Sequence, residues 1–164
     1  MSSEKERLKF TIERYDHYYD SVNNKCAVFL ALSTFIVGGL VAGYPTFLAN
    51  VTSSFWVHLS MGLLLSVGLG IMILVILAST PFLTNDKDSF LYFHAVSSQS
   101  VSVFAHRSGA CTEDEELQDL RIQVHHLATG LTAKFKKLRI AGVLFTIQFI
   151  LFIPTLLMVI VNLK

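Results

Sequence analysis

The stretch that decides the fold is CAVFLALSTFIVGGLVAGY, residues 26–44, which contains no charged residue. A helix that crosses a bilayer needs about 20 apolar residues. Two later runs, 55–79 and 140–161, are somewhat longer and also lack Asp, Glu, Lys and Arg. Because charged and aromatic residues fill positions 1–25, the first run is not typical of a cleaved signal peptide. The sequence therefore predicts an all-α membrane protein with three transmembrane helices.

The composition excludes some classes of partner. Hydrophobic residues make up 52% of the 164 residues, and charged residues only 15%. The formal net charge is +1, which argues against a nucleic-acid polymer as the partner. Cys26 and Cys111 lie far apart in the sequence, so a disulfide framework is not expected.

The distribution of lysine and arginine predicts the orientation in the membrane. Residues 1–25 carry five of them, the connection 80–139 carries seven, and the connection 45–54 carries none. Positive residues stay on the cytoplasmic side of a membrane. We therefore expect segments 1–25 and 80–139 in the cytoplasm and the C-terminus on the opposite side.

The two cytoplasmic segments have the pattern of long helical extensions of the membrane helices. Apolar residues recur at three- and four-residue spacing before the first run and before the third run, and the second of these helices begins near Thr112. We expect the two apolar stripes to pack on each other in a small helical bundle, which is compatible with a homo-oligomer. The stripes are Leu8, Ile12, Tyr15, Tyr19, Val22 and Leu117, Leu120, Val124, Leu127, Leu131, Leu138.

The segment 89–107, SFLYFHAVSSQSVSVFAHR, mixes aromatic residues with serines and is predicted as helix. Within the membrane runs, Gly39 and Gly43 form a GxxxG pair, and Gly62 and Gly70 repeat small-residue spacing with a serine between them. Such spacing allows close helix approach, so we expect the first two membrane helices to pack there.

Gln148 and Pro154 lie inside the third membrane run. A polar side chain at this depth should face protein or water. Two interpretations stay open: a hydrogen bond between helices, or a part of a pore wall or gate in a moving helix. We therefore name both residues as candidates for membrane gating.

The sequence gives no sign of an enzyme. It has no glycine-rich phosphate loop and no nucleophile elbow, so no catalytic residue is assigned. The spacing of the histidines and cysteines fits no metal site, and no cofactor is expected. What remains is a binding surface of aromatic rings, cations and small polar groups, which suits a nucleotide but is also typical of any juxtamembrane collar. Its aromatic and basic members are Tyr15, Tyr18, Tyr19, Phe90, Tyr92, Phe93, Arg14, Lys25, Arg107, Lys134 and Arg139.

Four short motifs in this order resemble a known family. They are N-N-K-C at 23–26, S-F-L-Y-F-H at 89–94, E-D-E-E-L at 113–117 and K-F-K-K-L-R-I-A at 134–141. Together they are similar to the small transmembrane effectors of the Pycsar antiphage systems. The resemblance implies that a partner cyclase makes a cyclic pyrimidine mononucleotide, cUMP or cCMP, during phage infection. It further implies that the effector responds in the bacterial inner membrane as a multi-pass protein with a periplasmic C-terminus and disrupts membrane integrity, so that the infected cell dies.

Within this interpretation we expect Lys25, Arg14 and Arg139 to contact phosphate, and Tyr92 and Phe93 to stack on the base. The full set of expected ligand-binding residues is Arg14, Asn24, Lys25, Tyr92, Phe93, His94 and Arg139. For Lys25 a plain role as a membrane anchor stays open. The alternative function is a membrane anchor or scaffold subunit that recruits a partner protein through its cytoplasmic helices.

Overall fold

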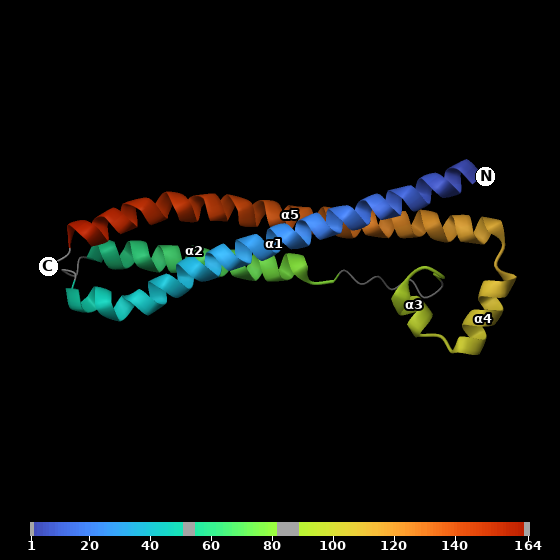
Figure 1. Ribbon diagram of the computed structural model, residues 1–164, viewed down its shortest axis with the longest axis horizontal. Coiled ribbons are helices and arrows are strands. Elements are labelled where there is room, and N and C mark those ends of the chain that lie inside the picture. The colour runs from blue at the N-terminus through green and yellow to red at the C-terminus, as the bar shows by residue number, and fades with distance from the viewer. Residues whose placement is uncertain (1, 51–54, 82–88, 163–164) are drawn as a thin grey trace. The chain divides into compact units, whose positions relative to one another are not determined.

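A computed structural model describes residues 2–50, 55–81 and 89–162, and it is helical with no strand in these ranges (Figure 1). The helices are α1 (Ser2–Asn50), α2 (Phe55–Ser79), α3 (Phe93–Ser97), α4 (Val101–Ala110) and α5 (Glu113–Val161). Three of them, α1, α2 and α5, are long and apolar enough to cross a membrane. The predicted all-α class with three candidate spans is confirmed.

The chain divides into two compact units, which we name by their composition. The polar unit comprises Met1–Ser21 and Pro81–Ala133, and the apolar unit comprises Val22–Thr80 and Lys134–Lys164. All twelve acidic residues belong to the polar unit, whereas the apolar unit has six basic residues and no acidic one. Both α1 and α5 contribute to each unit, and neither helix is interrupted at the unit boundary.

In the polar unit, α1 and α5 run in the same direction. Arg121 Nε and Nη2 donate to Glu4 Oε1 over 3.0 and 2.8 Å, and the Tyr19 hydroxyl donates to Leu127 O over 3.0 Å. The residue numbers of the paired positions rise together, which defines a parallel pair. Leu117 and Leu120 are buried beside these contacts. Because exposed ion pairs contribute at most about 1 kcal/mol each, burial of the apolar stripe supplies most of the stability.

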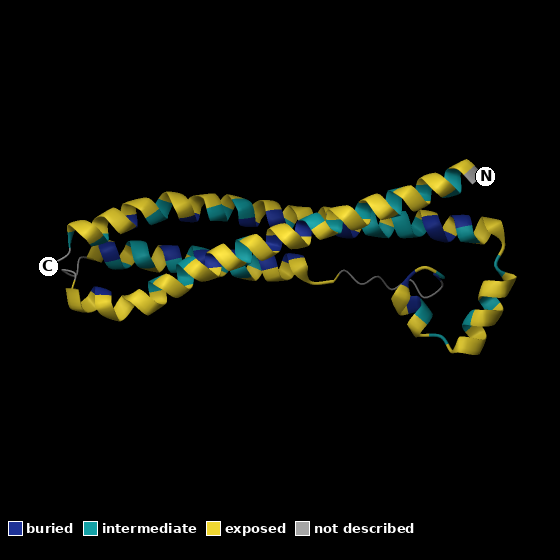
Figure 2. Cartoon of the chain, in the orientation of Figure 1, coloured by how far each residue is buried: buried dark blue, intermediate teal, exposed yellow. Residues whose placement is uncertain are grey.

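The predicted helix over 89–107 is divided in the structure into α3 and α4. Serine side chains explain the division, because serine hydroxyls compete for backbone groups near helix ends. Ser98 Oγ donates to Ala95 O over 2.8 Å at the end of α3, and Ser100 Oγ accepts from Val103 N over 3.4 Å at the start of α4. Figure 2 shows α4 without a buried residue, whereas α2 carries a row of them.

In the apolar unit, the close contact between helices differs from the expected one. An added Cβ atom would meet nothing within 4 Å at Gly39, Gly43, Gly62 or Gly70, so the prediction that these glycines mediate packing within the chain is wrong. The close approach lies at Gly68 instead, where α1 and α5 both come near α2. The rings of Phe29 on α1 and Phe145 on α5 stack with centroids 5.1 Å apart.

Both prolines of the long helices are accommodated within them. The first helix continues through Pro45 to Asn50, six residues past the end of the apolar run, and Asn50 Nδ2 donates back to Thr46 O over 2.9 Å. Pro154 lies inside α5. A proline removes one hydrogen bond of its helix, and neither residue ends its helix here.

Candidate functional site

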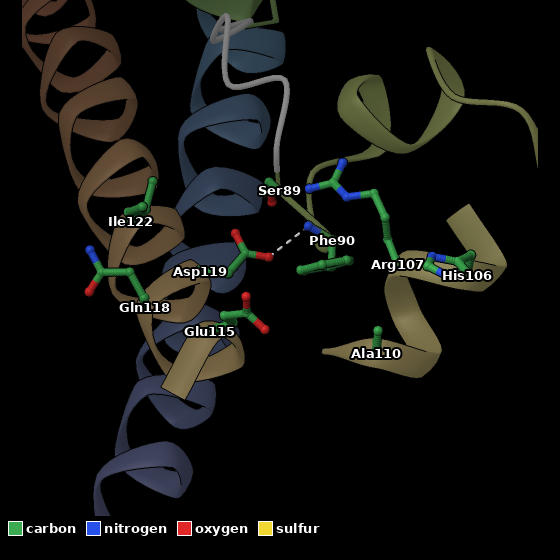
Figure 3. A pocket seen from close by; sticks show the side chains of 9 residues that line it. All are labelled: Ser89, Phe90, His106, Arg107, Ala110, Glu115, Gln118, Asp119 and Ile122. Atoms are coloured by element: carbon green, nitrogen blue, oxygen red, sulfur yellow. Dashed lines mark hydrogen bonds between the residues drawn. The ribbon is translucent and has the colours of Figure 1, made fainter. Parts of the chain in front are cut away.

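The polar unit contains an open pocket of about 470 Å³. Its walls come from the segment before α3, from α4 and from the first turns of α5 (Figure 3). The lining residues are Ser89, Phe90, His106, Arg107, Ala110, Glu115, Gln118, Asp119 and Ile122. This volume lies in the range of about 300–1,000 Å³ that small-molecule sites have.

An aromatic ring and a cation face each other in the pocket. The guanidinium carbon of Arg107 lies over the Phe90 ring, 5.1 Å from its centroid. Arg107 Nη1 also donates to Gln99 Oε1 over 3.2 Å, which orients the guanidinium. A guanidinium stacked on a ring directs its N–H donors outward in its own plane, toward anionic groups at the side.

A buried carboxylate fixes the position of Phe90. Asp119 is only 7% exposed, and its Oδ2 accepts the Phe90 backbone N–H over 2.7 Å. Ser89 Oγ accepts from the backbone N–H groups of Leu91 and Tyr92 over 3.1 and 3.0 Å. The bond to Asp119 therefore attaches Phe90 to α5. The bonds to Ser89 Oγ form the turn that leads into α3.

A second carboxylate comes from the capping box at the start of α5. Glu115 Oε2 accepts from Thr112 N and Thr112 Oγ1 over 2.8 and 2.9 Å, while Thr112 Oγ1 accepts from Glu115 N over 3.3 Å. The predicted helix start near Thr112 is confirmed. The backbone N–H of Thr112, followed by its hydroxyl, lowers the pKa of Glu115. Glu115 is thus ionised at neutral pH, and it shares a helix face with Asp119 four residues later.

The aromatic residues expected to stack on a ligand lie outside this pocket. Tyr92 is 6% exposed, and its ring packs against that of Phe93 with centroids 5.2 Å apart. Phe93 is 67% exposed, and His94 is exposed beside it. None of the three lines the pocket.

The expected phosphate-binding residues are distributed over both units. Arg14 belongs to the polar unit, where its Nε donates to the Tyr18 hydroxyl over 3.0 Å. Asn24, Lys25 and Arg139 belong to the apolar unit, and all three are exposed. The expected ligand set is therefore not gathered within either unit.

Sequence reasoning missed the acidic part of the pocket. Glu115 lies in the first turn of α5, where acidic residues complement the helix dipole, so its position in the sequence indicates only a helix start. Asp119 acts on a backbone N–H 29 residues earlier, and no local pattern reveals such a pairing. Phe90 and Arg107 did carry a signal, since both belong to the predicted aromatic and basic surface.

The apolar unit buries a polar side chain at its centre. Gln148 is fully buried, and among the described residues neither of its amide atoms has a hydrogen-bond partner. Ser33 Oγ on α1 is also buried and has no hydrogen-bond partner among the described residues. Pro154 is exposed six residues farther along α5. An unpaired buried amide costs about 1–3 kcal/mol, so Gln148 is retained against a stability cost.

We predict that Gln148→Met raises the stability of the resting protein. Methionine has a similar volume and removes both unpaired polar atoms, so the transition temperature in detergent should rise. Thr146→Met, at an exposed position of the same helix, is the matched control and should change little. A lower transition temperature for Gln148→Met would mean that the amide is paired in the resting protein.

Two lysines of α5 bind the carboxyl end of α2. Lys134 Nζ donates to Ala78 O and Thr80 O over 2.7 and 3.0 Å, and Lys137 Nζ donates to Leu77 O over 3.0 Å. The last turn of α2 has no basic residue of its own. Cations at a helix C-terminus satisfy its orphan carbonyls and its dipole. Lys134, which the sequence left open between ligand and lipid, thus binds protein.

No group of three or more His, Cys, Asp or Glu side chains in the described ranges is arranged to hold a metal ion.

These features define a class: a helical protein with three helices long and apolar enough to cross a membrane and with a small polar unit that contains a pocket. A family model, the Pycsar effector protein domain, matches residues 7–161. The chain belongs to this family of antiphage effectors. No curated protein and no solved structure is significantly similar to it.

Proposed function

We propose that the chain responds to a cyclic pyrimidine mononucleotide, cUMP or cCMP, and then disrupts the integrity of the bacterial inner membrane, which causes abortive infection. The observation that carries this proposal is the family match over residues 7–161. The nucleotide comes from a partner cyclase, and the protein itself acts as a membrane effector and not as a catalyst.

The continuous helices support a physical mechanism. Because α1 and α5 each extend from the polar unit into the apolar unit, a change of packing in the polar unit acts on both membrane helices. The nucleotide must bind the altered packing more tightly than the resting one, since a ligand with equal affinity for both shifts nothing. Separation or tilt of the membrane helices would then expose Gln148 and use Pro154 as a weak point of α5.

The charge distribution supports a topology for this mechanism. We place the N-terminus and the polar unit in the cytoplasm, where the nucleotide is made, and the C-terminus in the periplasm. The exposed outer faces of α1 and α5 in the apolar unit are apolar enough for lipid or for further copies of the chain. We propose that the effector assembles as a homo-oligomer in the membrane.

Liposome leakage tests the proposal. The purified protein is reconstituted in dye-loaded liposomes, and cUMP, cCMP, cAMP and cGMP are added separately. We expect one of the two pyrimidine nucleotides to release dye while the purine nucleotides do not. If cUMP and cCMP cause no leakage and do not bind, the proposed function is refuted. Cross-linking to a foreign protein in native membranes would favour a scaffold subunit instead.

Lys25→Ala separates a sensor role of this residue from a membrane anchor. Lys25 is exposed on α1 just before the apolar run. If Lys25 contacts the ligand, the variant should insert normally while nucleotide-triggered leakage falls about tenfold, the effect of losing one charged hydrogen bond. Lys136→Ala, another exposed lysine near a membrane run, is the control. Equal leakage from both variants would leave Lys25 with the anchor role.

A further inference from the structure

We propose that the pocket between Phe90, α4 and the start of α5 binds the nucleotide and selects cytosine over uracil. This inference rests on the proposed function and deepens it. It assigns the ligand to pocket residues of the polar unit in place of Tyr92, which is buried, and Phe93, which is exposed.

The positive and negative side chains of the pocket lie on different helices. Arg107 lies on α4, while Glu115 and Asp119 lie on α5, so the cationic and the anionic walls come from different elements (Figure 3). A cyclic mononucleotide has a matching polarity, because its phosphate is anionic while its base is neutral. The phosphate therefore goes to Arg107, and the base goes toward α5.

Phe90 provides the stacking platform between the two walls. Its backbone is fixed by the 2.7 Å bond to Asp119, and its ring meets the Arg107 guanidinium on one face. Stacking of a base on an aromatic ring accepts any base, so Phe90 supplies affinity and not selectivity. Selectivity must come from the polar groups of α5.

The carboxylates of α5 distinguish the two pyrimidines at one position. Cytosine carries an amino group at C4, which donates hydrogen bonds, whereas uracil carries a carbonyl oxygen there, which accepts them. Carboxylates only accept, so they bind the cytosine amino group and repel the uracil oxygen. Asp119 accepts from Phe90 N through Oδ2, and Glu115 accepts from Thr112 N through Oε2. Each carboxylate has a second oxygen that can accept from the cytosine amino group. The Gln118 amide, in the same wall, can donate to the acceptor atoms of cytosine.

Hydrogen bonding also holds Glu115 in the required charge state. The two Thr112 donors lower its pKa, so an accepting carboxylate persists at the pH of the cytoplasm.

Binding of cCMP and cUMP to the full-length protein in detergent, measured by titration calorimetry, tests the inference. We expect the natural protein to bind cCMP at least about tenfold more tightly than cUMP. Asp119→Asn keeps one acceptor oxygen and replaces the other by an amino donor, and Glu115→Gln does the same. Either variant should bring the two affinities close to equality. Asp114→Asn, an exposed acid outside the pocket, is the control and should keep the preference.

Stacking is tested with a second pair of variants. Phe90→Leu should weaken the binding of both nucleotides about tenfold, whereas Phe93→Leu should not. Thermal transitions of all variants show whether each is folded.

The outcomes separate the two levels of the proposal. If neither nucleotide binds the natural protein, the proposed function itself is wrong. If binding occurs but the ratio is near one, or is unchanged in both Asp119→Asn and Glu115→Gln, base selection by this pocket is wrong. If Phe90→Leu binds like Phe93→Leu, the nucleotide binds elsewhere on a functional effector.

Discussion

Lys134→Met is expected to destabilise the apolar unit by about 2 kcal/mol or more, because two charge-assisted hydrogen bonds are lost. The residue is 6% exposed, and its ammonium contacts Ala78 O and Thr80 O at the end of α2. Methionine fills a similar volume but cannot donate, so these carbonyls lose a charged donor. The transition temperature in detergent should therefore fall by several degrees.

Lys136→Met is the matched control for this experiment. Lys136 is exposed and lies two residues from Lys134 on the same helix, and the control replaces it by the same residue, methionine. Its substitution should leave the transition within a fraction of a degree, because an exposed side chain contributes little. Equal shifts in both variants would show that α2 does not depend on the Lys134 contacts. If α2 does depend on them, Lys134→Met should also raise dye leakage without any nucleotide.

Gly68→Ala is the second substitution with a large expected effect. A Cβ atom at this position would lie 2.4 Å from Val37 Cγ2 on α1 and 2.7 Å from Gln148 Nε2 on α5. Contacts below 3 Å force the neighbours to move, and such overpacking costs about 1–3 kcal/mol. We expect a lower transition temperature and a change in resting leakage, since one methyl group pushes on both partner helices.

Gly70→Ala distinguishes this packing effect from helix propensity. An added Cβ at Gly70 meets nothing within 4 Å, so alanine there should stabilise α2 by up to about 1 kcal/mol. The two substitutions lie two residues apart and should have opposite signs. Destabilisation by both would mean that the outer face of α2 packs on something else, and destabilisation by neither would contradict the close approach at Gly68.

The residues that could be predicted from sequence are those whose environment is set by local pattern. Three long uncharged runs require a membrane, and Thr112 with Glu115 three residues later marks a helix start. The structure confirms three helices long and apolar enough to cross a membrane, and it confirms the helix start at Thr112. The family, which the order of four short motifs indicated, is confirmed as well.

The features that sequence reasoning missed depend on contacts between distant segments. Glycine spacing pointed to Gly39 and Gly43, but spacing does not say which face of a helix meets its neighbour, and Gly68 carries the contact instead. The pairing of Asp119 with Phe90 and the contact of Lys134 with α2 also join segments that are distant in the sequence. From the sequence alone, Asp119 resembles an acidic residue near a helix start, and Lys134 resembles a basic residue at a membrane boundary.

The parallel pairing of α1 and α5 also determines the order in which the protein can assemble. Tyr19 and Glu4 find their partners 108 and 117 residues later in the chain. Contacts of such high sequence separation form slowly, because a long loop must be closed before they stabilise the fold. During synthesis, the N-terminal stripe therefore has no partner until the rest of α1 and the helices α2, α3 and α4 have been made. The polar unit is consequently completed after most of the chain has left the ribosome, and a truncated chain that ends before α5 cannot form it.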